Sequence, residues 1–227
     1  MGVKENFLKI QNEVNNKTNK NSEVNIIAIT KYFDEDKLIE AYEAGIRDFG
    51  ESKVIEALNK INKLSVEIKE NSRFHLIGHL QTNKVSKAVG EFEFIHSVDS
   101  LKVSKEISRI ALNKGIVQKV LLQINNAGEE QKYGFSIKEL FDNFKEIQEL
   151  KGIEIVGIMN IAPFEAGKEE LKRLFKEVVE IRNELEKKFN CELKEISMGM
   201  SHDYIEAVEE GATMIRIGRK LFIPDTK

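Results

Sequence analysis

Short apolar runs alternate with helical patterns along nearly the whole chain. At the start, Val3, Phe7, Ile10 and Val14 are spaced four, three and four residues apart, which predicts an amphipathic helix. The segment 26–30, IIAIT, is rich in β-branched residues and lacks polar alternation, as is typical of a buried parallel strand. Seven further strands are predicted at 47–51, 74–78, 93–98, 119–125, 153–159, 194–200 and 213–218.

Residues with known capping preferences mark the ends of the intervening helices. Asp34 is expected to begin a helix that ends at Gly45, and Ser136 with Glu139 forms a capping box before another. Ser201 follows the seventh strand, where we expect it to cap the next helix.

Eight strand–helix units without a composition break favour one closed barrel. The fold class predicted is therefore α/β, a single (β/α)₈ TIM barrel with an extra N-terminal helix. We expect one domain over residues 1–227, in which residues 1–22 form the N-terminal helix and a polar connector. A doubly wound open sheet is the alternative.

Composition narrows the class of protein. The chain has 227 residues, of which 41% are hydrophobic and 32% charged, with a net charge of −3. These values describe a folded, water-soluble protein without a nucleic-acid footprint. Cys191 is the single cysteine, which excludes an internal disulfide, and the four histidines have no metal-ligand spacing. With no apolar leader and no long apolar run, we expect a cytoplasmic protein without a membrane segment.

Polar residues and glycines gather where the predicted strands end. In a barrel the carboxyl ends of the strands carry the active site, and phosphate often binds after strands seven and eight. Lys31 follows the first strand, and its amine would be partly neutral and nucleophilic in an apolar setting. The other strand-end residues of interest are Ser52, His79, Ser201, Gly218 and Arg219.

Arg216 lies inside the eighth strand, where an unpaired guanidinium would be costly. It shares one face with Met214 and Gly218, whereas the isoleucines between them share the other. Two interpretations are open, namely a salt bridge to a buried carboxylate such as Glu51 or contact with a ligand.

Gly199, Ser201 and Gly218 suggest a place for an anion. Glycines let backbone N–H groups approach it closely, and a helix beginning at Ser201 would direct its positive end there. A lysine and a phosphate site on one rim fit either a Schiff-base aldolase or a protein that holds pyridoxal 5′-phosphate. The residue pattern leaves both open.

Several segments together resemble the YggS/PROSC family of pyridoxal phosphate homeostasis proteins. They keep the family's order and spacing from about residue 26 to residue 222. They are AITK at 28–31, FGES at 49–52, FHLIGHLQTNK at 74–84, IHSVD at 95–99, SMGMS at 197–201 and EEGATMIRIG at 209–218.

The resemblance implies a barrel of the alanine racemase N-terminal type with bound pyridoxal 5′-phosphate. Lys31 would form the covalent aldimine, and Arg216 would face the pyridine nitrogen. Ser201, Gly218 and the backbone N–H of Arg219 would hold the phosphate.

Two of the candidate pocket residues differ from those usual in the family. Ser52 and His79 match positions lining the same pocket, but Ser52 stands where asparagine is usual. Arg219 stands where threonine is usual, so a hydroxyl contact to phosphate would be absent.

The resemblance also implies a role in vitamin B6 homeostasis rather than robust catalysis. The protein would bind the cofactor, buffer it and deliver it to apo-enzymes that use it, so no catalytic residue is assigned. The rivals are an amino-acid racemase and a Schiff-base aldolase. A racemase of this type uses a tyrosine from a C-terminal β domain, for which a chain ending at Lys227 leaves no room. Without that domain we expect a monomer.

Overall fold

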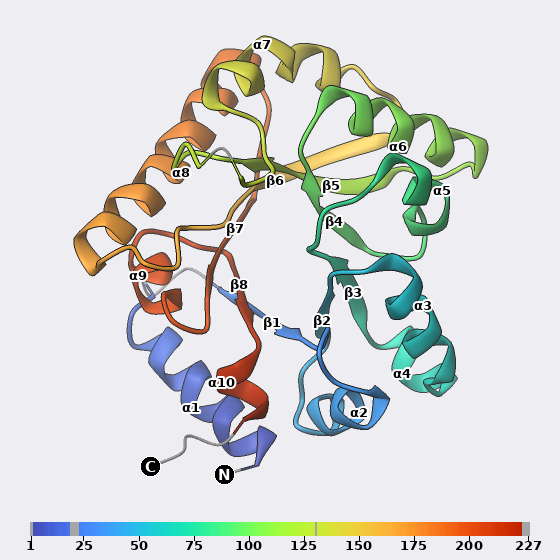
Figure 1. The fold of residues 1–227 in the computed structure, drawn as a ribbon, viewed down its shortest axis with the longest axis vertical. Helices are drawn as coiled ribbons and strands as arrows, with labels where there is room; N and C mark the ends of the chain where they lie inside the picture. The colour runs from blue at the N-terminus through green and yellow to red at the C-terminus, as the bar shows by residue number, and fades with distance from the viewer. Residues whose placement is uncertain (1, 19–22, 130, 224–227) are drawn as a thin grey trace.

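Eight parallel strands close into a barrel in chain order, with β8 returning to pair with β1 (Figure 1). The computed structural model describes residues 2–18, 23–129 and 131–223. The predicted barrel is confirmed, and the open sheet is wrong because Asn25 and Ile26 of β1 pair with Met214 and Ile215 of β8. The strands are β1 Asn25–Ile29, β2 Asp48–Glu51, β3 Arg73–Leu76, β4 Phe94–Val98, β5 Gln118–Ile124, β6 Ile153–Asn160, β7 Glu195–Met200 and β8 Met214–Ile217.

Helices surround this barrel on its outside (Figure 1). The N-terminal helix α1 is confirmed, whereas the connector at 19–22 lies outside the described residues. The short helices α4 and α10 were not expected from the pattern. The helical elements are α1 Val3–Asn15, α2 Glu35–Glu43, α3 Val54–Lys63, α4 Val66–Glu70, the 3₁₀ turn η1 Thr82–Lys84, α5 Val85–Ala88, α6 Leu101–Asn113, α7 Ile137–Gln148, α8 Lys168–Phe189, α9 Tyr204–Glu209 and α10 Arg219–Phe222.

Most of the predicted helix ends are confirmed. Asp34 occupies the N-cap of α2, Gly45 follows its end with a φ of 100°, and Ser136 forms the capping box with Glu139. The expectation that Ser201 caps a helix is wrong. The N-cap of α9 is Asp203, and the Ser201 hydroxyl instead accepts a hydrogen bond from the backbone N–H of Gly218, directly after β8.

The alternation along β8 separates two apolar layers. Ile215 and Ile217 belong to the main core between the strands and the helices. Met214 points the other way and packs with Ile27 and Ile29 inside the barrel. Arg216 shares its face with Met214, as the alternation predicts, and the structure shows that this face is the interior of the barrel.

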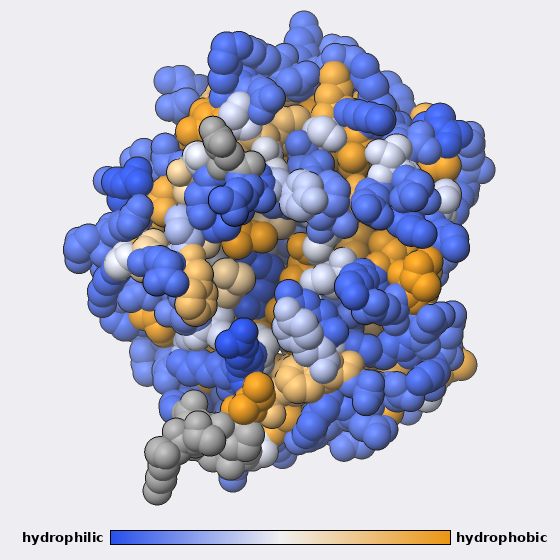
Figure 2. All heavy atoms as spheres, in the orientation of Figure 1, coloured by the Kyte–Doolittle hydropathy of each residue, from blue (hydrophilic) through white to orange (hydrophobic). Residues whose placement is uncertain are grey.

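Helices α1 and α10 close the side of the barrel where β8 meets β1 (Figure 1). The Asn6 side chain donates to the Leu221 carbonyl at 3.0 Å, which joins the two helices. In the same orientation, Figure 2 shows hydrophilic residues over most of the periphery and hydrophobic residues towards the middle of the face. No helix within the described part of the chain is both long and apolar enough to span a bilayer.

Candidate functional site

The predicted site residues lie at the ends of five neighbouring strands. The order of strands around the barrel places β7, β8, β1, β2 and β3 side by side. Parallel strands end at the same rim, so the residues that follow them face a common opening. Five segments from different parts of the sequence therefore end at this rim.

Lys31 lies in the turn directly after β1, one residue beyond Thr30. Its side chain is exposed, and its ammonium lies 4.9 Å from the centre of the Tyr32 ring. The expectation of an apolar setting for this amine is therefore wrong: the strand is buried, but the lysine extends beyond it. An exposed amine at this rim remains accessible to an aldehyde-bearing ligand.

A buried ion pair holds the backbone just before Lys31. The Glu51 carboxylate accepts hydrogen bonds from the Thr30 hydroxyl and from Lys60 Nζ, both at 2.6 Å. Lys60 Nζ also donates to the Thr30 carbonyl at 2.7 Å. We call Thr30, Glu51 and Lys60 the β1 clamp. Sequence reasoning missed Lys60, because nothing in the pattern of α3 shows that its ammonium reaches the end of β1.

Arg216 is buried inside the barrel without a carboxylate partner. Its Nη1 donates to Ser197 Oγ at 2.7 Å and its Nη2 to the Asn160 carbonyl at 2.8 Å. No ion pair within 4 Å joins it to a carboxylate of the described residues, and the alternative of a Glu51 salt bridge is wrong. Burial lowers the pKa of Arg216 to about 10, against a raising effect of the Asp203 charge. The guanidinium is therefore still a cation at neutral pH.

Ser201 and Gly218 link the ends of β7 and β8. The backbone N–H of Gly218 donates to Ser201 Oγ at 3.1 Å. A Cβ built on Gly218 would lie 3.5 Å from Ile29 Cβ, so this link also adjoins β1. The helix anticipated from Ser201 begins three residues later, at Tyr204, so its N-terminus does not lie at Ser201. Arg219 begins α10 with an exposed side chain.

Ser52 and Gly78 bring the segments after β2 and β3 together. A Cβ on Gly78 would lie 2.3 Å from the Ser52 carbonyl oxygen, so only glycine fits this crossing. His79 follows immediately, beyond the end of β3.

The His79 ring is held on two sides. Its Nδ1 lies 2.8 Å from Asp99 Oδ2, and its face stacks on Tyr133 with ring centres 3.7 Å apart. Tyr133 comes from the segment between β5 and α7, and sequence reasoning missed it because no local pattern pairs residues 54 positions apart. With its Nδ1 oriented by a carboxylate, the imidazole presents Nε2 away from Asp99.

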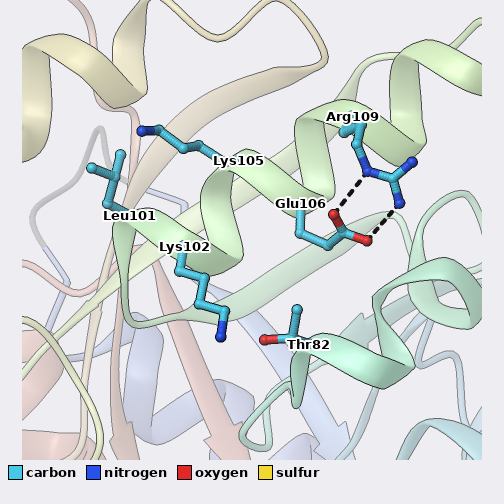
Figure 3. Close-up of a pocket in the computed structure, with 6 residues that line it drawn as sticks. All are labelled: Thr82, Leu101, Lys102, Lys105, Glu106 and Arg109. Atoms are coloured by element: carbon cyan, nitrogen blue, oxygen red, sulfur yellow. Dashed lines mark hydrogen bonds and ion pairs between the residues drawn. The ribbon is translucent and has the colours of Figure 1, made fainter.

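A separate surface pocket of about 410 Å³ lies along α6 and η1 (Figure 3). Arg109 and Glu106 form an ion pair at 2.7 Å on its wall, and Thr82 lies opposite. None of the predicted site residues lines it. Among the described residues, no cluster of three His, Cys, Asp or Glu side chains is arranged to hold a metal ion.

Two histidines are buried inside the barrel, and they make stability sensitive to acid. Burial lowers the pKa of His75 despite the Asp48 carboxylate, and it lowers the pKa of His96 well below the usual value. In the unfolded chain both histidines would have a pKa of about 6.5. As pH falls through that value the unfolded state binds more protons than the folded state, so the free energy of unfolding is expected to decrease.

Urea unfolding at pH 7.5 and pH 5.5 checks this expectation. The midpoint should be lower at pH 5.5, and replacing His96 by glutamine should reduce the difference. Equal midpoints at the two pH values would contradict it.

The fold and the rim define a barrel of the alanine racemase N-terminal class. Residues 4–225 match the family model described as alanine racemase, N-terminal domain. The chain is 39% identical to the pyridoxal phosphate homeostasis protein of Aquifex aeolicus over 183 residues, which are 81% of this chain and 79% of that protein. It is 36% identical to the human protein of the same name, covering 87% and 75% of the two chains.

Solved structures agree with these relationships. PipY of Synechococcus elongatus with pyridoxal phosphate bound superposes with a TM-score of 0.86 at 34% identity, covering 97% of this chain and 99% of PipY. An alanine racemase of Clostridium difficile shares the fold, with a TM-score of 0.72 at 15% identity over 97% of this chain and 58% of the racemase. This chain belongs to the family of pyridoxal phosphate homeostasis proteins.

Proposed function

We propose that this chain binds pyridoxal 5′-phosphate and serves in its intracellular homeostasis, without robust catalysis. Lys31 would hold the cofactor covalently, with its Nζ replacing the oxygen of the cofactor's aldehyde and water released. The relatives named above are homeostasis proteins, and PipY has been solved with the cofactor bound.

The observation that carries the proposal is the buried Arg216. A guanidinium has five N–H donors and no acceptor. Two of its N–H groups reach neutral oxygens of the described residues, and no carboxylate neutralises it. A buried cation of this kind suits an acceptor such as a pyridine nitrogen, and arginine is one of the known partners of that atom in pyridoxal phosphate proteins.

The rest of the rim supplies the other groups that the cofactor requires. Ser201 and the Gly218 N–H already contact each other, so a phosphate could take both as donors by replacing that hydrogen bond. Gly218 adjoins the end of β1, which brings these donors near the segment carrying Lys31. We assign Ser52 and His79 to the wall of the same pocket, and the backbone N–H of Arg219 to the phosphate.

An arginine beside the ring nitrogen also argues against strong catalysis. Bound pyridoxal phosphate stabilises carbanions by drawing electrons into its ring, and it does so best when the ring nitrogen is protonated. Arg216 donates its own hydrogen bond and remains charged, which keeps that nitrogen unprotonated. The same site would therefore retain the cofactor while activating an amino acid only weakly. We further propose that the protein is a monomer and that it delivers the cofactor to apo-enzymes.

Adding the cofactor to the purified protein tests the binding proposal. We expect a visible absorption band, and borohydride reduction followed by peptide mass analysis should place the added mass on Lys31. Absence of uptake would contradict the proposal. Fast racemisation of alanine would favour the racemase, and trapping of a carbonyl substrate by cofactor-free protein would favour the aldolase.

A further inference from the structure

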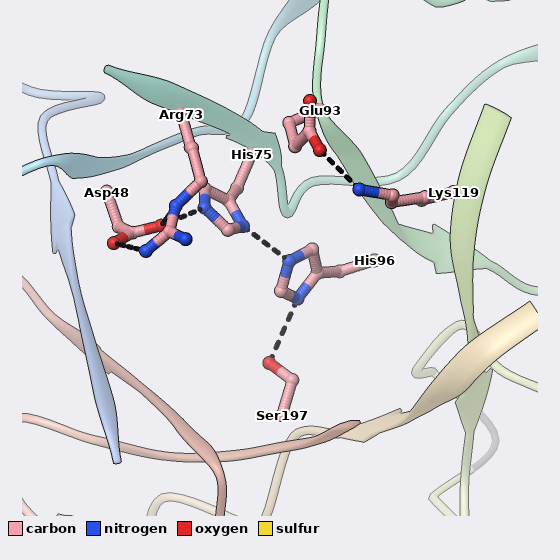
Figure 4. Close-up of polar contacts among 7 residues, drawn as sticks. All are labelled: Asp48, Arg73, His75, Glu93, His96, Lys119 and Ser197. Atoms are coloured by element: carbon pink, nitrogen blue, oxygen red, sulfur yellow. Dashed lines mark hydrogen bonds and ion pairs between the residues drawn. The ribbon is translucent and has the colours of Figure 1, made fainter. Parts of the chain in front are cut away.

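A chain of hydrogen bonds runs through the barrel from Arg216 to Asp48 at the start of β2, and Figure 4 shows the part from Ser197 to Asp48. Arg216 Nη1 lies 2.7 Å from Ser197 Oγ, which lies 3.0 Å from His96 Nδ1. His96 Nε2 lies 2.9 Å from His75 Nδ1, and His75 Nε2 lies 2.8 Å from Asp48 Oδ1. All five side chains are buried. We call these residues the interior chain.

The two ends of the interior chain determine the direction of every hydrogen bond in it. A guanidinium only donates, and an ionised carboxylate only accepts. Burial raises the pKa of Asp48, but hydrogen bonds from His75 and Arg73 outweigh it and hold the pKa below its usual value. Arg73 makes two hydrogen bonds to this carboxylate, at 2.7 and 2.6 Å. Asp48 is therefore ionised at neutral pH.

With neutral imidazoles, only one arrangement of protons satisfies the chain. His75 must carry its proton on Nε2 to donate to Asp48, so its Nδ1 accepts from His96 Nε2–H. His96 Nδ1 then accepts from the Ser197 hydroxyl, whose lone pairs are left for Arg216. Reversing any step would set two acceptors against each other at hydrogen-bond distance, which is costly in a buried site.

We propose that Asp48, His75 and His96 are positioning residues for the cofactor site, acting through Ser197 on Arg216. They give the serine proton an acceptor at His96 Nδ1, so that the Ser197 oxygen keeps its lone pairs for Nη1 and the remaining N–H groups keep a fixed direction. This inference rests on the proposed function, in which Arg216 meets the ring nitrogen. The set joins four strands, β2, β3, β4 and β7, to β8.

Replacing Asp48 by asparagine removes the constraint on direction. A carboxamide can donate as well as accept, so the whole sequence of hydrogen bonds can reverse. His96 would then carry its proton on Nδ1 and donate to Ser197, whose oxygen would accept from both His96 and Arg216 Nη1 while its own proton lost the acceptor at His96. The guanidinium would then share the Ser197 oxygen with a second donor and would be held less firmly.

Nitrogen-15 NMR of histidine-labelled, cofactor-free protein tests the proton arrangement directly. In the wild type, His75 and His96 should both carry the proton on Nε2. In Asp48→Asn a Nδ1–H form of His96 should appear. The exposed histidines are assigned with His79→Gln and His202→Gln. A wild-type His96 protonated on Nδ1 would overturn the inference, even if the variant failed to fold.

Cofactor binding supplies the second measurement. Ser197→Ala should raise the dissociation constant for pyridoxal phosphate roughly tenfold and shift the visible band, since a hydrogen bond to a charged group is lost. Ser197→Thr keeps a hydroxyl and should restore both. The control is Ser104→Ala, which removes an equally buried hydroxyl that donates to the Ser100 carbonyl in α6.

The outcomes separate this inference from the proposed function. Wild-type affinity and spectrum in both Ser197→Ala and Asp48→Asn would overturn the positioning role and leave cofactor binding intact. Failure of the wild type to take up the cofactor would overturn both.

Discussion

Replacing Lys31 by alanine is expected to abolish the visible band and covalent retention of pyridoxal phosphate. No other amine would be held at the position of the aldehyde, whereas the ring and phosphate contacts would remain. We expect the dissociation constant to rise by roughly two orders of magnitude, which corresponds to about 2.7 kcal/mol. Stability should change by less than about 0.5 kcal/mol, because the side chain is exposed. Absorbance titration and borohydride trapping measure the first effect, and urea unfolding the second.

Lys53 provides a matched control on the same rim. It is an exposed lysine directly after Ser52, and it forms an ion pair with Glu56 at the surface. Lys53→Ala should retain the band and the covalent adduct. A Lys31→Ala protein that still gives a reduced adduct of the same mass would assign the imine to another lysine and contradict the proposal.

The strands were predicted to within one or two residues because buried parallel strands give continuous apolar runs. β5 and β6 show this well, with predicted ranges of 119–125 and 153–159 against observed Gln118–Ile124 and Ile153–Asn160. The closed barrel was predicted from the count of eight strand–helix units. The helices α4 and α10 have five and four residues, too short for a 3.6-residue period to be recognised.

The roles of individual polar residues were harder to predict, since their partners are distant in the sequence. Serine is a residue type that often caps helices, yet the Ser201 hydroxyl accepts a hydrogen bond from Gly218, 17 residues away, where the ends of β7 and β8 lie side by side. His96 was one of four histidines without a metal pattern, and its partner Ser197 is 101 positions away. Such pairs depend on the register of the closed barrel, which no local pattern contains. The fold could therefore be predicted from the sequence, whereas the network of polar contacts could not.

Glu51 illustrates the same limit and has an energetic consequence. From the sequence, Arg216 was one possible partner of Glu51. In the structure Glu51 pairs with Lys60 instead, at 2.6 Å, and the side chains of Lys60 and Glu51 are only 11% and 3% exposed. Removing one member of a buried pair leaves an uncompensated charge. Lys60→Met is therefore expected to lower the free energy of unfolding by about 3–5 kcal/mol. The midpoint and slope of urea unfolding measure this loss.

Two further variants distinguish a lost ion pair from a lost side chain. Glu51→Gln combined with Lys60→Met removes the orphaned carboxylate, so the double variant should recover more than half of the stability lost in the single variant. Lys53→Met breaks the exposed pair with Glu56, whose side chains are 72% and 62% exposed, and should cost less than about 0.5 kcal/mol. If the double variant is as unstable as Lys60→Met alone, the uncompensated carboxylate does not account for the loss. In that case the hydrogen bond from Lys60 to the Thr30 carbonyl, which both variants lack, holds the backbone before Lys31.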